Sequence, residues 1–112
     1  MNKITLKMLN VDLIACYGKM KLDVTIYQTR KAKKNKGLSI RIEDATDHCH
    51  VNPYLEWRGK DKFKFHVGCC FGGQGADWPE FNDELQALEK DRDFAKWFKE
   101  NIYPVAERLT KL

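Results

Sequence analysis

The stretches Leu22-Asp23-Val24-Thr25-Ile26-Tyr27 and Leu38-Ser39-Ile40-Arg41-Ile42-Glu43 decide the fold of this chain. In both, every second residue is aliphatic and the residues between are mostly polar, a pattern that predicts β-strands with one buried and one wet face. Residues 31–37, which join the two strands, are rich in lysine and end in a glycine. The two strands are therefore expected to form a hairpin with a longer loop.

The period-two pattern continues on both sides of this hairpin. Residues 4–8 and 62–67 alternate in the same way, and a shorter strand is expected around Leu55 and Trp57. Residues 10–17 are out of phase with residues 4–8, so a bulge near Asn10 would keep a single face buried.

Two short turns complete the predicted sheet. Gly18-Lys19 should join a first strand to the strand near residues 20–30, and Arg58-Gly59-Lys60-Asp61 should close a second hairpin. Consecutive hairpins predict an antiparallel meander of about five strands, whose polar face stays in water.

The pattern changes after the glycine-rich segment 72–75, where apolar residues recur every three or four positions, as on one side of a helix. Asp77 is a suitable N-cap for a first helix, and Asp91 or Asp93 for a second. Pro104 should kink or break the second helix. The two apolar stripes are Trp78, Phe81, Leu85 and Leu88, then Phe94, Trp97, Phe98 and Ile102.

These elements predict an α+β fold in which two C-terminal helices pack on one face of the sheet. With 112 residues, the chain is expected to be a single domain spanning residues 1–112, with a β-sheet part (1–70) and a helical part (76–112). No apolar run is long enough to span a membrane, and the N-terminus lacks the apolar core of a secretory signal. We therefore expect a cytoplasmic protein with reduced cysteines.

Charge is distributed unevenly along the chain. Residues 1–70 carry 14 Lys and Arg against 7 Asp and Glu, whereas residues 71–112 carry 6 against 9. A basic sheet half suggests a partner with an acidic surface, although lysines on a sheet also favour solubility and discourage edge pairing.

Histidine and cysteine residues gather in one window of the sequence. Their residue types suit zinc, but no C-x-x-C pair is present and only His66 and Cys69 have a finger-like interval. We therefore expect no cofactor, and zinc remains the alternative. The weak metal candidates are His48, Cys49, His50, His66 and Cys69.

Catalysis finds limited support in the sequence. Cys69 or Cys70 could act as a nucleophile next to a histidine base, but the stretch between Cys70 and the expected helix is long. The loop of residues 71–77 lacks the lysine of a phosphate-binding loop, so we interpret it as a corner between sheet and helix or as a contact loop. No coherent catalytic set emerges, and we do not expect an enzyme.

Two binding functions remain. The first is a non-catalytic protein that acts by protein–protein interaction, such as an inhibitor or immunity-type protein of a phage or other mobile element, which occludes a site on a larger partner. The second is a nucleic-acid-binding module that uses the basic 30–36 loop and the polar sheet face. A homodimer is allowed by either reading. The predicted partner-binding residues are Lys31, Lys33, Lys34, Lys36, Arg41, Tyr54, Trp57, Lys62, Lys64, Phe71 and Trp78.

Overall fold

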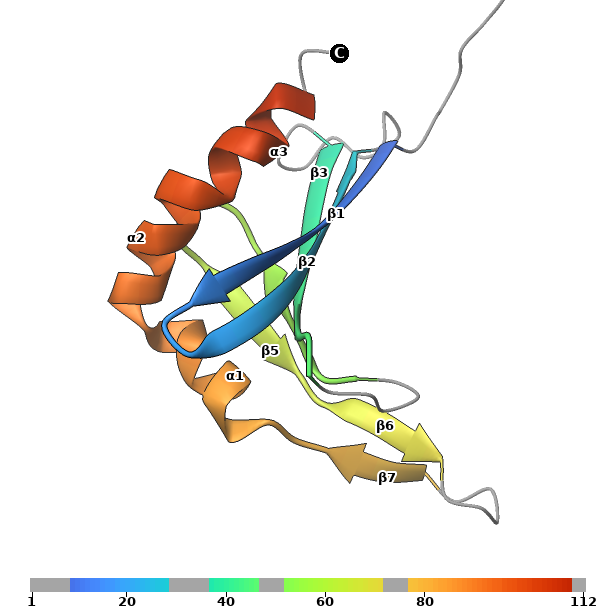
Figure 1. Ribbon diagram of the computed structural model, residues 1–112. Helices are drawn as coiled ribbons and strands as arrows, with labels where there is room; N and C mark the ends of the chain where they lie inside the picture. The colour runs from blue at the N-terminus through green and yellow to red at the C-terminus, as the bar shows by residue number, and fades with distance from the viewer. Residues whose placement is uncertain (1–8, 29–36, 47–51, 72–76, 110–112) are drawn as a thin grey trace, which may run out of the picture.

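A five-stranded antiparallel sheet forms the centre of the protein (Figure 1). The computed structural model describes residues 9–28, 37–46, 52–71 and 77–109. The strands follow one another in space as they do in sequence, so the predicted meander and the α+β class are confirmed. They are β1 (Leu9–Tyr17), β2 (Met20–Gln28), β3 (Leu38–Asp44), β4 (Tyr54–Trp57) and β5 (Phe63–His66).

Both predicted short turns are present. Gly18 has φ 60°, the conformation that a two-residue hairpin favours at its first central position, and it joins β1 to β2. The β4–β5 hairpin closes over residues 58–62, where Gly59 and Lys60 have φ values of 101° and 52°. The bulge predicted near Asn10 is wrong, because β1 pairs with β2 without interruption from Leu9 to Tyr17. The predicted strand at residues 4–8 lies outside the described residues.

The first predicted helix begins later than the sequence pattern suggested. Residues Asp77–Glu80 form strand β7, which pairs with β6 (Gly68–Phe71) in a separate two-stranded ribbon. Pairing with β6 overrides the capping pattern at Asp77, and Phe81 is 60% exposed instead of lying in a helical core stripe. The segment 72–75 therefore joins two strands rather than a sheet to a helix, although its residues are not themselves described.

The helical part starts at Asn82, whose side chain caps α1 (Asp83–Ala87) by accepting a hydrogen bond from the Leu85 amide. A short 3-10 turn, η2 (Leu88–Lys90), leads to α2 (Arg92–Asn101), and α3 (Tyr103–Leu109) follows after a break at Ile102. Asp91 caps α2, as predicted, and Pro104 lies in the first turn of α3, where its missing amide costs nothing. None of the helices among the described residues is long and apolar enough to cross a membrane.

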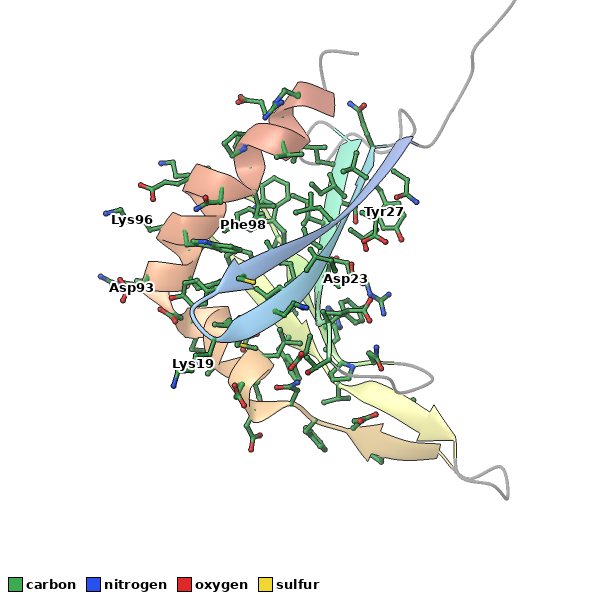
Figure 2. All side chains as sticks on the ribbon, viewed as in Figure 1. Lys19, Asp23, Tyr27, Asp93, Lys96 and Phe98 are labelled. Atoms are coloured by element: carbon green, nitrogen blue, oxygen red, sulfur yellow. The ribbon has the colours of Figure 1, made fainter. Side chains whose placement is uncertain are left out.

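The core lies between the sheet and the helices. Leu22, Val24 and Ile26 of β2 are fully buried, as the period-two pattern predicts, and they share the core with Phe94 and Phe98 of α2. Figure 2 shows Phe98 between helix and sheet, whereas Asp23 and Tyr27 project from the opposite, open side of the sheet. The sheet therefore has one face packed and one face free among the described residues.

Candidate partner-binding site

A groove runs between the 58–62 loop and the helices α2 and α3, with a volume of about 880 Å³. In Figure 1, the ends of β4 and β5 that carry this loop run behind the two helices. The size falls within the range of protein binding pockets. The groove is lined by Trp57, Lys60, Asp61, Arg92, Ala95, Lys96, Phe98, Lys99 and Tyr103.

Aromatic side chains form the floor of this groove. The Trp57 ring centroid lies 6.0 Å from that of Phe98 and 5.7 Å from that of Tyr103. The indole N–H of Trp57 donates a hydrogen bond of 2.9 Å to the carbonyl of Lys60, which ties the loop to the floor. Because these rings are held by the core, the floor is a fixed apolar surface that needs little ordering on binding.

The rim of the groove is strongly basic. Four cations, Lys60, Arg92, Lys96 and Lys99, surround a single carboxylate, Asp61. The three cations of α2 are spaced at i, i+4 and i+7, which places them on one side of the helix. None of the four forms an ion pair with another described residue, so their charge is available to an anionic ligand.

The open face of the sheet, in contrast, has a balanced charge. Within the strands, four carboxylates stand against three cations, and Arg58, which follows β4 and pairs with Glu56, adds a fourth cation, so this face is no basic patch. Such a balance gives little general attraction for a phosphate backbone. By strand alternation, the carboxylates are Asp12, Asp23, Glu43 and Glu56, and the cations are Lys21, Arg41 and Lys64.

Two of these carboxylates are close enough to share a proton. A hydrogen bond with Asp12, burial, and the charges of Asp12 and Glu43 raise the pKa of Asp23 to about 6. The Oδ1 atom of Asp23 is buried without a hydrogen-bond partner among the described residues. The hydroxyl of Thr25 donates a 3.5 Å hydrogen bond to Asp12. Asp23 therefore changes its charge near pH 6, as a carboxylate beside like-charged groups does.

A stacked row of side chains crosses β3, β4 and β5 on the same face. The Arg41 guanidinium lies 3.8 Å from the centre of the Tyr54 ring, and the Tyr54 and His66 rings stack at 4.7 Å. Arg41 Nε is 3.1 Å from the carboxylate of Glu43, close enough for an ion pair but not aligned as a hydrogen bond. Two of the predicted partner-binding residues, Arg41 and Tyr54, are thus engaged with their own neighbours.

Glu56 anchors the end of this row. His66 Nε2 lies 2.9 Å and Arg58 lies 3.3 Å from the same Glu56 oxygen. Burial alone would raise the pKa of Glu56, but the hydrogen bond with His66 and the charges of Arg58 and His66 outweigh it and lower the pKa. His66 is therefore bound to a carboxylate and stacked on a ring, a setting that explains its position without a metal or a nucleophile.

The β6–β7 ribbon projects from the body of the protein (Figure 1). At its root, Val67 precedes Gly68 and Phe81 follows Glu80, and these two apolar side chains are 50% and 60% exposed. Phe71 and Trp78, both predicted partner-binding residues, lie in this ribbon, opposite Asp77 and Cys70 respectively. Val67 and Phe81 alone are ordinary surface residues and do not by themselves mark a contact surface.

The other predicted site residues are distributed as follows. Lys62 and Lys64 are exposed at β5, and Trp57 is only 5% exposed, so only its edge at the groove could reach a partner. Cys69 is a free, partly buried thiol. No group of three potential metal ligands occurs among the residues that the structure describes. The remaining candidates, Lys31, Lys33, Lys34, Lys36, His48, Cys49 and His50, lie outside the described residues.

No protein family model, curated protein or solved structure shows significant similarity to this chain. The geometry of the groove is therefore the main guide to function. Lys60, Arg92, Lys96 and Lys99 are not among the binding residues predicted from the sequence. The spacing of the three α2 cations could have been noticed, but their meeting with Lys60 depends on how the 58–62 loop packs against α2.

Proposed function

We propose that the protein is a non-catalytic binding protein that acts by protein–protein interaction, as an inhibitor or immunity-type protein of a phage or mobile element would. In this proposal the groove receives an acidic segment of a larger partner. The single observation that carries it is the combination of four cations that form no ion pair with a described residue and a fixed aromatic floor. Charge complementarity steers such a segment to the groove, and the floor accepts an apolar anchor.

The acidic character of the partner follows from the rim. Each cation is exposed, so a carboxylate gains a modest amount from pairing with it, but several pairs together set the orientation of the segment. A neutral or basic segment would leave the cations facing one another around the groove. An aromatic or aliphatic side chain at the centre of the segment would displace water mainly from Ala95 and Tyr103, because Trp57 and Phe98 are only 5% and 1% exposed.

A short capped peptide with one phenylalanine between two pairs of acidic residues tests this proposal. In a ¹⁵N-resolved NMR titration, we expect the indole N–H signal of Trp57 to shift, because its acceptor belongs to the lip of the groove. The same peptide with amides in place of carboxylates should bind at least about tenfold more weakly, the equivalent of about 1.4 kcal/mol.

Charge-reversal variants distinguish binding of the peptide in the groove from general electrostatic attraction to the protein. The double variant Lys96→Glu/Lys99→Glu should lose the titration, whereas Lys21→Glu/Lys64→Glu, with the same change in net charge on the open sheet face, should retain it. Equal binding of the neutral peptide, or no response at Trp57 at millimolar peptide, would count against the proposal.

The nucleic-acid alternative is tested in the same titration with a single-stranded thymidine oligonucleotide. The basic 30–36 loop on which that alternative depends is not among the described residues, and the described sheet face has a balanced charge. Tighter binding of the oligonucleotide than of the acidic peptide, with a steep salt dependence, would favour the alternative over the proposed function.

A further inference from the structure

The two edges of the five-stranded sheet are protected very differently. At the β5 edge, the amide of Phe65 donates a 2.9 Å hydrogen bond to the Glu89 carboxylate, so a side chain from η2 occupies the position of a further strand. This strand has four residues and carries the exposed Lys64. A short edge, covered and charged, resists pairing with another chain.

The β1 edge is less protected among the described residues, because Asp12 is its one charged side chain and no described side chain bonds its outward backbone groups. It runs for nine residues, Leu9–Tyr17, without proline, lysine, arginine or a bulge. Tyr17 and Met20 close a two-residue hairpin, so they form a hydrogen-bonded pair, and the pairing alternates from there along the strand. The N–H and C=O groups of Asn10, Asp12, Ile14 and Cys16 therefore point away from β2, and no described residue bonds them.

Apolar side chains on both faces of β1 are left partly uncovered. Ile14, at the middle of the strand, is 57% exposed on the open face of the sheet. On the helix side, Val11, Leu13 and Ala15 are only half-buried, whereas Leu22, Val24 and Ile26 on the neighbouring strand are fully buried. A strand added at this edge would cover apolar surface on both faces at once.

We propose that this edge pairs with a second copy of the chain, β1 against β1 in antiparallel orientation, with the two-fold axis at Ile14. This register places Ile14 beside the partner's Ile14 and Leu13 opposite the partner's Ala15. It also places Asp12 opposite the partner's Cys16. The outward backbone groups of Asp12, Ile14 and Cys16 would then be satisfied in both copies, and the pair would form one continuous ten-stranded sheet.

Self-complementarity is what favours a second copy as the occupant of this edge. Asp12 is the one charged residue of β1, and centring on Ile14 keeps it away from the partner's Asp12. A register shifted to centre on Asp12 would place two carboxylates side by side, which is unfavourable. The ladder centred on Ile14 uses the described residues of β1 and its turn alone, and its isologous symmetry closes at two copies.

Light scattering and amide exchange on the full chain test the dimer. At high concentration we expect a mass of twice 13.1 kDa, with slowed exchange at the amides of Asp12, Ile14 and Cys16 and restored fast exchange on dilution. Ile14→Lys should abolish the dimer without unfolding, because this side chain is largely exposed. Ser39→Lys adds the same charge at an exposed position in the interior of the sheet and should leave the dimer intact.

Disulfide trapping tests the register. Asp12→Cys should form a cross-link to the partner's native Cys16 on mild oxidation, identified by peptide mass spectrometry, because paired Cα atoms lie within disulfide range. Ser39→Cys, away from the edge, should form no such link. A monomer at millimolar concentration, a dimer that survives Ile14→Lys, or a dimer in which the 12–16 cross-link never forms would each overturn the proposal. These outcomes do not depend on whether the groove binds a peptide.

Discussion

Asp23→Asn should stabilise the protein at neutral pH and have little effect in acid. The pKa of Asp23 is raised from 3.8 to about 6, first by its hydrogen bond with Asp12, then by burial and by the charges of Asp12 and Glu43. Between about pH 4 and pH 6, the carboxyl of Asp23 therefore keeps its proton in the folded protein but has lost it in the unfolded chain. The stabilisation from this proton is complete below about pH 4 and is lost as the pH rises through 6.

The magnitude follows from the size of the shift. About 2 pKa units correspond to about 3 kcal/mol if the whole effect is felt at neutral pH. Asp23 lies on the solvent side of the sheet, where water screens part of the repulsion, so we expect about 1 kcal/mol. Asparagine is neutral at every pH, and its amide can donate to Asp12 as the protonated carboxyl does. The variant should therefore exceed the wild type by about 1 kcal/mol at pH 7.5.

Urea unfolding followed by tryptophan fluorescence between pH 4 and pH 7.5 measures this difference directly. Asp44 and Glu56, whose pKa values are lowered, make the opposite contribution, which is lost as the pH falls. Comparing the variant with the wild type at each pH removes their contribution. Glu100→Gln, the same loss of one charge on the exposed side of α2, should show no such pH-dependent gain.

Asp12→Asn provides the internal check, because it removes the repulsion between Asp12 and Asp23 by neutralising Asp12 instead of Asp23. Each single variant should be stabilised at pH 7.5, and the double variant should gain less than the sum of the two. A free energy difference for Asp23→Asn that is the same at pH 4 and pH 7.5, or additive gains in the double variant, would refute the idea of a shared proton.

Two further predictions concern the packing of helices against the sheet. Asp91→Ala removes the cap that accepts hydrogen bonds from the amides of residues 93 and 94 and from the Tyr17 hydroxyl. It should lower the free energy of unfolding by about 1–2 kcal/mol, whereas Asp91→Asn should lower it by less, as measured by urea unfolding. Glu89→Ala leaves the Phe65 amide without its hydrogen-bond acceptor. It should lower the free energy of unfolding by about 1–3 kcal/mol and speed hydrogen exchange at that amide. Glu84→Ala, on the exposed side of α1, is its control, and equal losses in the two would contradict this role of Glu89.

The sequence predicted the sheet well because the alternation in β2 and β3 reflects directly which face is buried. It placed the first helix too early for a physical reason. Asp77, Pro79 and Glu80 suit the first turn of a helix, and the spacing of Phe81, Leu85 and Leu88 extends the pattern. Only the pairing of Asp77–Glu80 with Gly68–Phe71, a contact between residues apart in the chain, selects the strand.

The groove was harder to anticipate than the fold. Over residues 71–112 acidic residues outnumber basic ones, so the average charge hides the basic side of α2. Arg92, Lys96 and Lys99 share one side of α2 only because of the helical spacing. Lys60 lies near them only because the β4–β5 hairpin packs against α2. Trp57 illustrates the same difficulty, since its phase in β4 correctly indicates the core but not that one edge of its ring borders the groove.

The two proposed surfaces lie in different parts of the molecule, which bears on how they would act together. β1 is the first strand of the sheet, whereas the 58–62 loop joins β4 to β5 at the opposite side of the meander. Pairing through β1 would therefore leave both grooves of a dimer accessible. Because linked sites raise the local concentration of a second binding event, a partner with repeated acidic segments would be held far more tightly than a single segment. A small protein could in this way occlude a much larger partner.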